Sequence, residues 1–284
     1  GYGFMDISGL QAVDRGGDAL TGDFITNNKP FYFSVAIPEG NYDITLNLGD
    51  TKGTSETTVR VENRRLLLND VTTKQGEIVQ KQISVHIKDS IIRNQNGEKI
   101  GIVKLKPRET KYLHWDNLLT IEFNDKAPKV CSVIIQPNTT GKTIYLTGDS
   151  TVVDAQYEPW ASWGQMLPYF FVPNNVIIAN YAESGETLKA FEDRHRIDKI
   201  WIQKAKQLGA IPVLVTSMNR RVFDENNKIV NTLDDFPDAM REISKEENVS
   251  LIDLNALSKK LFEAMGPEAA KKAYDSHLTH YTHS

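Results

Sequence analysis

The stretch Thr143-Ile-Tyr-Leu-Thr-Gly-Asp-Ser-Thr151 decides the fold of the second half of this chain. A short apolar run leads into Gly148-Asp149-Ser150, so the sequence predicts a strand, a tight turn and a serine at the strand's carboxyl end. Open α/β sheets place their reactive groups there. At the start of a helix, such a serine has an exposed hydroxyl and a free backbone N–H that can bind an oxyanion. By itself the tripeptide is weak evidence, because Asp-Ser is also ordinary turn chemistry.

The residues around this stretch alternate between strand-like and helix-like patterns. Apolar runs lie at 144–146, 176–179, 211–215 and 249–253, and helical apolar spacing is found at 188–201, 236–247 and 256–265. Buried strands separated by helices predict a parallel sheet covered on both faces, which is an α/β/α architecture.

The first half of the chain has a different period. Apolar and polar residues alternate every two positions at 31–37, 42–48, 56–62, 79–87, 101–106, 118–123 and 129–136. Many short strands without helical spacing predict an all-β sandwich, and the turn residues at 38–41 predict a hairpin between the first two strands. The polar segment 136–142 is the predicted joint. We therefore predict a multidomain chain, with a β-sandwich at 1–138 and an α/β/α domain at 143–284.

Composition excludes some classes of function. The chain has 284 residues, 33 Lys and Arg against 37 Asp and Glu, and a formal net charge of -4, which argues against nucleic acid as a partner. No run approaches the roughly 20 apolar residues of a membrane-spanning helix. The chain starts at Gly1 with no signal segment, as expected for a processed secreted protein or a trimmed fragment. The single Cys131 cannot form an internal disulfide.

Four segments together carry a resemblance to a known family. In order they are Gly148-Asp149-Ser150-Thr151, Trp163-Gly-Gln-Met-Leu-Pro168, Asn180-Tyr-Ala-Glu-Ser-Gly-Glu-Thr187 and Gly209-Ala-Ile-Pro-Val-Leu-Val-Thr-Ser-Met-Asn-Arg-Arg221. They resemble blocks of the Gly-Asp-Ser (SGNH-type) hydrolases, most closely the rhamnogalacturonan acetylesterases. Residues 1–138 loosely resemble the galactose-binding-like modules that precede carbohydrate-active domains.

The resemblance implies a fold, an activity and a location. It implies a flavodoxin-like α/β/α domain and a serine esterase that removes acetyl groups from pectic rhamnogalacturonan, an acetylated polysaccharide. No metal or organic cofactor is required. Because pectin is found outside the cytoplasm, the implied location is extracellular or periplasmic.

A serine nucleophile needs a histidine base and an acid that orients it. The candidates lie in Tyr274-Asp275-Ser276-His277-Leu278-Thr279-His280-Tyr281. The resemblance implies His277 as the general base. The family's acid, three residues earlier, falls on Tyr274, so Asp275 is the nearest candidate acid, one residue late. His280 is a competing base.

Two other interpretations of this segment remain open. His277, His280 and His283 have the three-residue spacing of a metal cluster, although no further Cys or carboxylate at ligand spacing supports zinc. The segment is also compatible with a solvated surface tail.

The resemblance implies two backbone donors for an oxyanion, Ser150 and Gly185, where a glycine lets the backbone approach the substrate. The family's third donor, an asparagine in a Gly-x-Asn-Asp block, is absent. No strand is predicted between the helical segments 188–201 and 202–208 either. Either a segment near 194–202 is missing from this sequence, which we favour, or the domain has lost a central strand. The intact mass of the protein distinguishes these alternatives.

Three residues are candidates for substrate binding. Arg220 and Arg221 follow a strand end, and an arginine can hold a galacturonate carboxylate with two parallel hydrogen bonds. Trp160 is a candidate for stacking on a sugar, whereas Trp163 is predicted to pack in the core. Alternative functions are an esterase acting on another acetylated glycan or a lipid ester, and a catalytically inactive carbohydrate-binding protein. The oligomeric state is not predicted.

Overall fold

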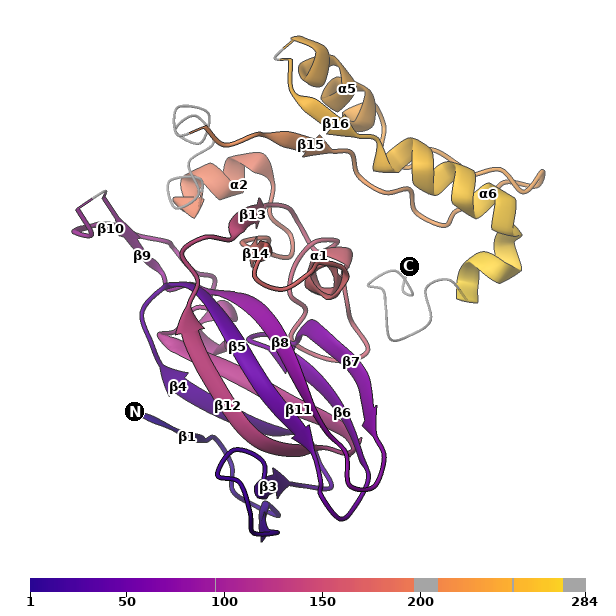
Figure 1. The fold of residues 1–284 in the computed structure, drawn as a ribbon. Helices are drawn as coiled ribbons and strands as arrows, with labels where there is room; N and C mark the ends of the chain where they lie inside the picture. The colour runs from indigo at the N-terminus through magenta and orange to yellow at the C-terminus, as the bar shows by residue number, and fades with distance from the viewer. Residues whose placement is uncertain (95, 197–208, 247, 273–284) are drawn as a thin grey trace. The chain divides into compact units, whose positions relative to one another are not determined.

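The computed structural model describes residues 1–94, 96–196, 209–246 and 248–272 (Figure 1). The chain divides into two compact units, Gly1–Lys199 and Ile200–Ser284. In the described part of the chain, no helix is both long and apolar enough to cross a membrane.

The first unit contains two five-stranded sheets in which all neighbouring strands are antiparallel. In spatial order, the first sheet consists of β1 (Tyr2–Phe4), β4 (Phe31–Ala36), β11 (Leu118–Ala127), β6 (Ser55–Val61) and β7 (Arg65–Thr73). The second consists of β2 (Gln11–Asp14), β3 (Asp23–Thr26), β12 (Lys129–Pro137), β5 (Gly40–Gly49) and β8 (Ile78–Ile87).

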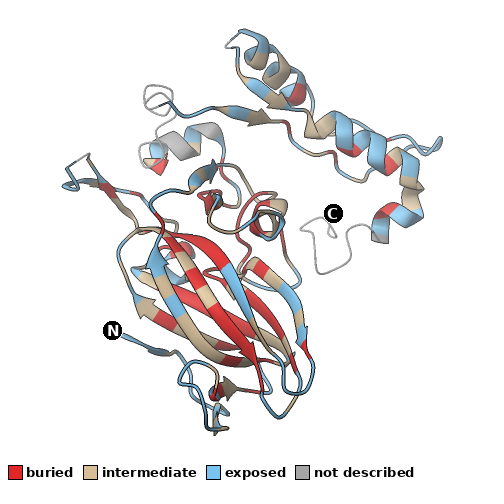
Figure 2. Cartoon of the chain, viewed as in Figure 1, coloured by how far each residue is buried: buried red, intermediate tan, exposed pale blue. Residues whose placement is uncertain are grey.

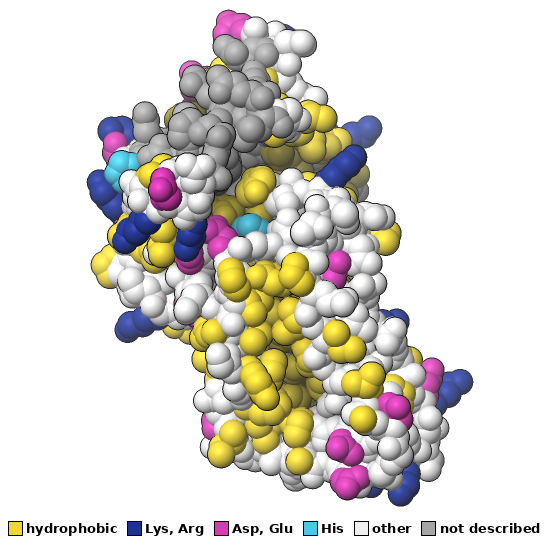
Figure 3. All heavy atoms as spheres, turned by 60° about the vertical axis from the view of Figure 1, so that its left-hand side comes forward, with side chains coloured by type: hydrophobic (Ala, Val, Ile, Leu, Met, Phe, Trp, Pro, Cys, Tyr) yellow, Lys and Arg dark blue, Asp and Glu magenta, His cyan; other side chains and the backbone are white. Residues whose placement is uncertain are grey.

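Both sheets contribute to one hydrophobic core (Figure 2). Ile44, Leu46 and Leu48 alternate along β5 and are fully buried, and they share this core with Ile121 and Phe123 of β11. Two sheets with a common core form a β-sandwich. The all-β sandwich predicted for the first half of the chain is therefore confirmed. On the face drawn in Figure 3, hydrophobic side chains also form a strip over the sandwich.

The hairpin predicted at residues 38–41 is wrong. Strand β4 pairs with β1 and β11, whereas β5 pairs with β12 and β8, so the short connection crosses from one sheet to the other. Alternation identifies a strand with one buried face, but both sheets face the same core and give the same signal. The strand predicted at 101–106 is also shorter, because β10 (Lys99–Ile102) ends at Ile102 after pairing with β9 (Ile91–Arg93).

A parallel strand pair and short helices complete the described first unit. Strand β13 (Lys142–Leu146) pairs with β14 (Val176–Asn180) in parallel. The accompanying helices are η1 (Glu109–Lys111), α1 (Trp163–Met166), η2 (Leu167–Phe170) and α2 (Leu188–Asp193). Leu146, Val153 and Ile178 form a small core, against which Trp163 packs as predicted. The domain boundary at 138–143 stays a prediction, because the compact unit continues past it.

In the second unit, β15 (Val213–Val215) and β16 (Ser250–Ile252) form another parallel pair. Its helices are α5 (Phe236–Glu246) and α6 (Leu254–Lys272), which is kinked at Gly266 before Pro267. Parallel pairing is therefore observed at all four predicted strand positions. A single parallel sheet in an α/β/α domain stays a prediction, since the described residues form two separate pairs.

Candidate active site

Ser150 lies in a tight turn after β13. The carbonyl of Asp149 accepts hydrogen bonds from the backbone N–H groups of Val152 and Val153, both at 3.1 Å, and its side chain accepts one from Thr151 N–H at 2.9 Å. Gly148 is required beside this turn, because an added Cβ would lie 2.6 Å from the Val152 side chain. Ser150 is half-buried and begins a turn, whereas the predicted helix starts only at Trp163.

The loop that carries Gly185 lies beside the Ser150 turn. Beyond the ends of β13 and β14, Tyr181 N–H donates to Leu146 O at 2.9 Å and Glu183 N–H donates to Gly148 O at 3.0 Å. Gly185 is exposed and has φ of 68°, a left-handed conformation that glycine adopts easily. The two predicted oxyanion donors, Ser150 and Gly185, thus belong to neighbouring loops that follow the carboxyl ends of the two parallel strands.

Two buried amides fix the turn to its surroundings. Asn180 Nδ2 donates to Val152 O at 2.6 Å and to Asp154 Oδ1 at 2.8 Å. Gln165 Nε2 donates to Ala155 O at 3.0 Å and to two carbonyls of the connection between β6 and β7. Because buried polar groups are costly unless paired, these bonds specify one conformation for residues 149–155.

A buried ion pair joins the sandwich to the same turn. Arg65 at the start of β7 contacts Asp154 Oδ2 through Nε at 3.0 Å and Nη2 at 2.8 Å, and both side chains are almost fully buried. Although burial alone would raise the pKa of Asp154, the Arg65 guanidinium holds it well below its usual range. Lys88 donates to Asn180 O and lies 4.4 Å from the centre of the Trp115 ring. Burial lowers the pKa of Lys88 to about 7.

The described residues also contain a histidine–aspartate pair, but it does not have the exposure of a catalytic base. His114 Nδ1 lies 3.6 Å from Asp154 Oδ2, and both side chains are 1% exposed or less. Burial, with the nearby Lys88 charge, lowers the pKa of His114 to about 4. Because the ring is almost completely buried, we assign His114 a structural role and not that of the catalytic base.

The other predicted site residues are distributed over both units. Trp160 is half-buried in the first unit, and its carbonyl accepts from Arg64 Nη1 at 3.0 Å. In the second unit Arg220 is exposed, whereas Arg221 Nη1 donates to Ala270 O at 3.0 Å. His277 and Asp275, together with the alternatives His280 and His283, lie outside the described residues.

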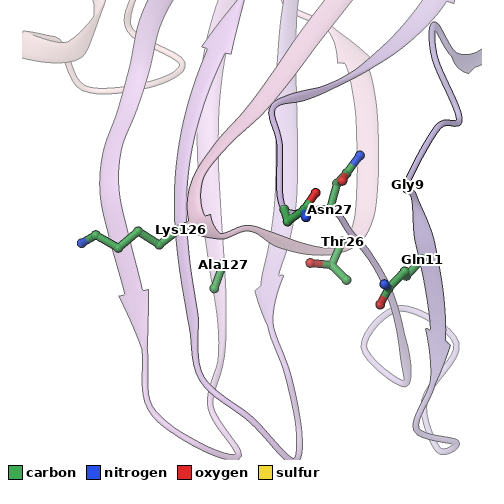
Figure 4. Close-up of a pocket in the computed structure, with 7 residues that line it drawn as sticks. Gly9, Gln11, Thr26, Asn27, Lys126 and Ala127 are labelled. Atoms are coloured by element: carbon green, nitrogen blue, oxygen red, sulfur yellow. The ribbon is translucent and has the colours of Figure 1, made fainter.

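Two polar features of the sandwich lie on strands remote in sequence from Ser150. Among the described residues, Glu56, Asp70 and Asp125 have carboxylate oxygens within 4.8 Å of one another, and Lys126 Nζ lies 2.6 Å from Glu56. A pocket of about 350 Å³ is lined by Gly9, Gln11, Thr26, Asn27, Asn28, Lys126 and Ala127. Figure 4 shows the Lys126 side chain pointing away from Thr26 and Gln11. Neither feature contains a predicted catalytic residue.

Comparison with known proteins places the chain in a family. No protein-family model matches it. Rhamnogalacturonan acetylesterase RhgT from Bacillus subtilis is 33% identical over 169 residues, covering 46% of this chain and 72% of that protein. The uncharacterized esterase YxiM from B. subtilis is 24% identical over 96% of this chain and 77% of its own length. The crystal structure of YxiM covers 98% of this chain and 84% of its own, with a TM-score of 0.47 and 21% identity.

The identity with RhgT extends over most of that protein's length, well beyond the short motifs. The chain belongs to the SGNH-type esterase family.

Proposed function

We propose that this chain is a carbohydrate esterase that hydrolyses acetyl esters on pectic rhamnogalacturonan. The observation that carries the proposal is the pairing of the Ser150 turn with the Gly185 loop through Glu183 N–H and Gly148 O. Such an arrangement provides a hydroxyl and two backbone donors for one ester carbonyl. The substrate follows from the name of the relative RhgT.

The reaction proceeds through an acetyl-enzyme. Ser150 Oγ attacks the acetyl carbonyl carbon and its proton passes to His277, which Asp275 orients. The backbone N–H groups of Ser150 and Gly185 stabilise the resulting oxyanion. As the bond between the acetyl carbon and the sugar oxygen breaks, His277 gives the proton to this oxygen, which leaves as a hydroxyl. Water activated by His277 then releases acetate and restores Ser150.

The acidic polymer is recognised by charge and by stacking. Arg220 and Arg221 hold galacturonate carboxylates, and Trp160 stacks on a sugar ring. For Arg220→Gln we expect a raised KM on acetylated rhamnogalacturonan and an unchanged KM on neutral acetylated xylan. An equal change in KM on both polymers contradicts the carboxylate contact.

The protein acts where pectin occurs, in the extracellular or periplasmic space.

Acetate release from acetylated rhamnogalacturonan tests the proposal, with native protein and Ser150→Ala measured side by side. Loss of a serine nucleophile lowers kcat on the order of 10⁴-fold or more. Acetylated xylan and a lipid ester serve as comparison substrates. A higher kcat/KM on either of them would identify that ester, and not rhamnogalacturonan, as the preferred substrate. A folded native protein that binds the polymer but releases no acetate would instead be a carbohydrate-binding protein.

A further inference from the structure

The loop that carries Gly185 is held by two cationic side chains from far away in the sequence. Lys106 and Arg108 follow β10 and lie within the first 138 residues of the chain. Arg108 Nη2 donates to Ser184 O at 2.5 Å, and Lys106 Nζ donates to the same oxygen at 2.7 Å. One backbone carbonyl thus accepts hydrogen bonds from both cations.

The carboxylates on either side of Gly185 strengthen this attachment. Arg108 Nε donates to Glu183 Oε1 at 2.8 Å, and Lys106 Nζ lies 2.7 Å from Glu186 Oε1. Both carboxylates are almost completely buried, so their charge needs cationic partners. Arg194 and Arg196 also lie near Glu186 Oε1, at 3.5 and 3.8 Å, so Lys106 shares this carboxylate with them. The two cations thereby hold the loop through Glu183, through Glu186 and through the Ser184 carbonyl between them.

The carbonyl of Ser184 belongs to the same peptide unit as the N–H of Gly185. A trans peptide is planar, so its C=O and N–H groups point in opposite directions. Fixing the direction of Ser184 O therefore fixes the direction of Gly185 N–H. Hydrogen bonds from cations also polarise the peptide and strengthen its N–H as a donor.

We propose that Arg108, assisted by Lys106, is a positioning residue that aims Gly185 N–H at the oxyanion of the ester reaction. This inference rests on the proposed esterase function and extends it, because residues of the predicted sandwich domain become part of the active-site apparatus. Removal of a whole oxyanion donor costs about 10²- to 10³-fold in kcat. For a donor that is retained but misdirected, we expect a loss on the order of 10- to 100-fold.

The test measures kcat and KM on a small neutral ester, p-nitrophenyl acetate, for the full chain and for Arg108→Met and Lys106→Met. We expect a lower kcat with little change in KM, and a parallel fall in the rate at which a phosphonate labels Ser150. Arg108→Lys, which keeps one cationic donor, is expected to recover part of the loss. Arg93→Met is the matched control, because the ion pairs of Arg93 in the described part of the chain are with Asp89 and Glu39 and not with the Gly185 loop.

The possible outcomes separate this inference from the proposed function. An unchanged kcat in both folded variants overturns the positioning role. The side chain of Arg108 is 49% exposed, so a higher KM confined to the acidic polymer would instead assign it to substrate binding and also overturn the inference. Native protein without Ser150-dependent activity on any ester overturns both proposals. If circular dichroism shows that Arg108→Met does not fold, the kcat of Lys106→Met decides whether the inference holds.

Discussion

The apolar sandwich core and the buried Arg65–Asp154 ion pair beneath the Ser150 turn use different side chains to reach a similar degree of burial. In the sandwich, Leu46, Ile121 and their neighbours are apolar and interdigitate between two sheets. Beneath the turn, Arg65 and Asp154 are buried to the same extent but are held by directional hydrogen bonds. An apolar core stabilises without strict orientation, whereas a polar network is favourable in one geometry only. The comparison indicates that the apolar core stabilises the fold, whereas the polar network both stabilises it and fixes the geometry of the candidate site.

The largest expected effect comes from breaking the buried ion pair. Arg65→Met leaves Asp154 charged and buried without its main partner, so we expect a loss of about 3–5 kcal/mol in the free energy of unfolding. Because Asp154 also accepts from Asn180, kcat is expected to fall as well. Urea unfolding and ester kinetics measure the two effects.

A double variant sharpens this prediction. In Arg65→Met/Asp154→Leu both members of the ion pair are removed, so the double variant is expected to be more stable than Arg65→Met alone while kcat stays low. Additive losses of stability would show that the cost comes from packing rather than from an uncompensated carboxylate.

Truncation in the sandwich core should lower stability without changing kcat. Leu46 is fully buried, so Leu46→Ala is expected to lower the free energy of unfolding by about 2–5 kcal/mol. At a temperature where the variant is folded, kcat should equal that of the native protein. A fall in kcat without unfolding would contradict the division of roles between the two cores.

The smallest expected effect concerns pH and His114. Its pKa in the folded protein is lowered to about 4 by burial, so the unfolded chain binds a proton at higher pH than the folded one. The stability that the neutral His114 contributes to the folded protein is fully present above pH 6.5. It is lost as pH falls toward 4, and the loss is at most about 3 kcal/mol. Unfolding midpoints of native protein and His114→Phe between pH 4 and pH 7 measure it. If the unfolding midpoint of the native protein depended on pH as weakly as that of His114→Phe, His114 would not have the lowered pKa.

Local patterns predicted most strands of the sandwich and the turn at Ser150. Alternation along β5 and β8 is a property of consecutive residues, and the apolar run of β13 followed by Gly148 requires no distant information. The same reasoning failed at residues 38–41, because alternation does not say in which of two sheets a strand pairs. It also missed β7, which carries the polar residues Asn69 and Asp70 between its apolar positions.

The sequence by itself determined the all-β character of the first half, the Ser150 turn and the family, since motifs and periods are encoded by neighbouring residues. Only the tertiary structure decided what holds the turn and the Gly185 loop. Arg65 and Asp154 are 89 positions apart, and Arg108 and Glu183 are 75 positions apart. In a sequence such residues resemble ordinary surface charges, because a buried charge is distinguished only by the partner that folding brings to it.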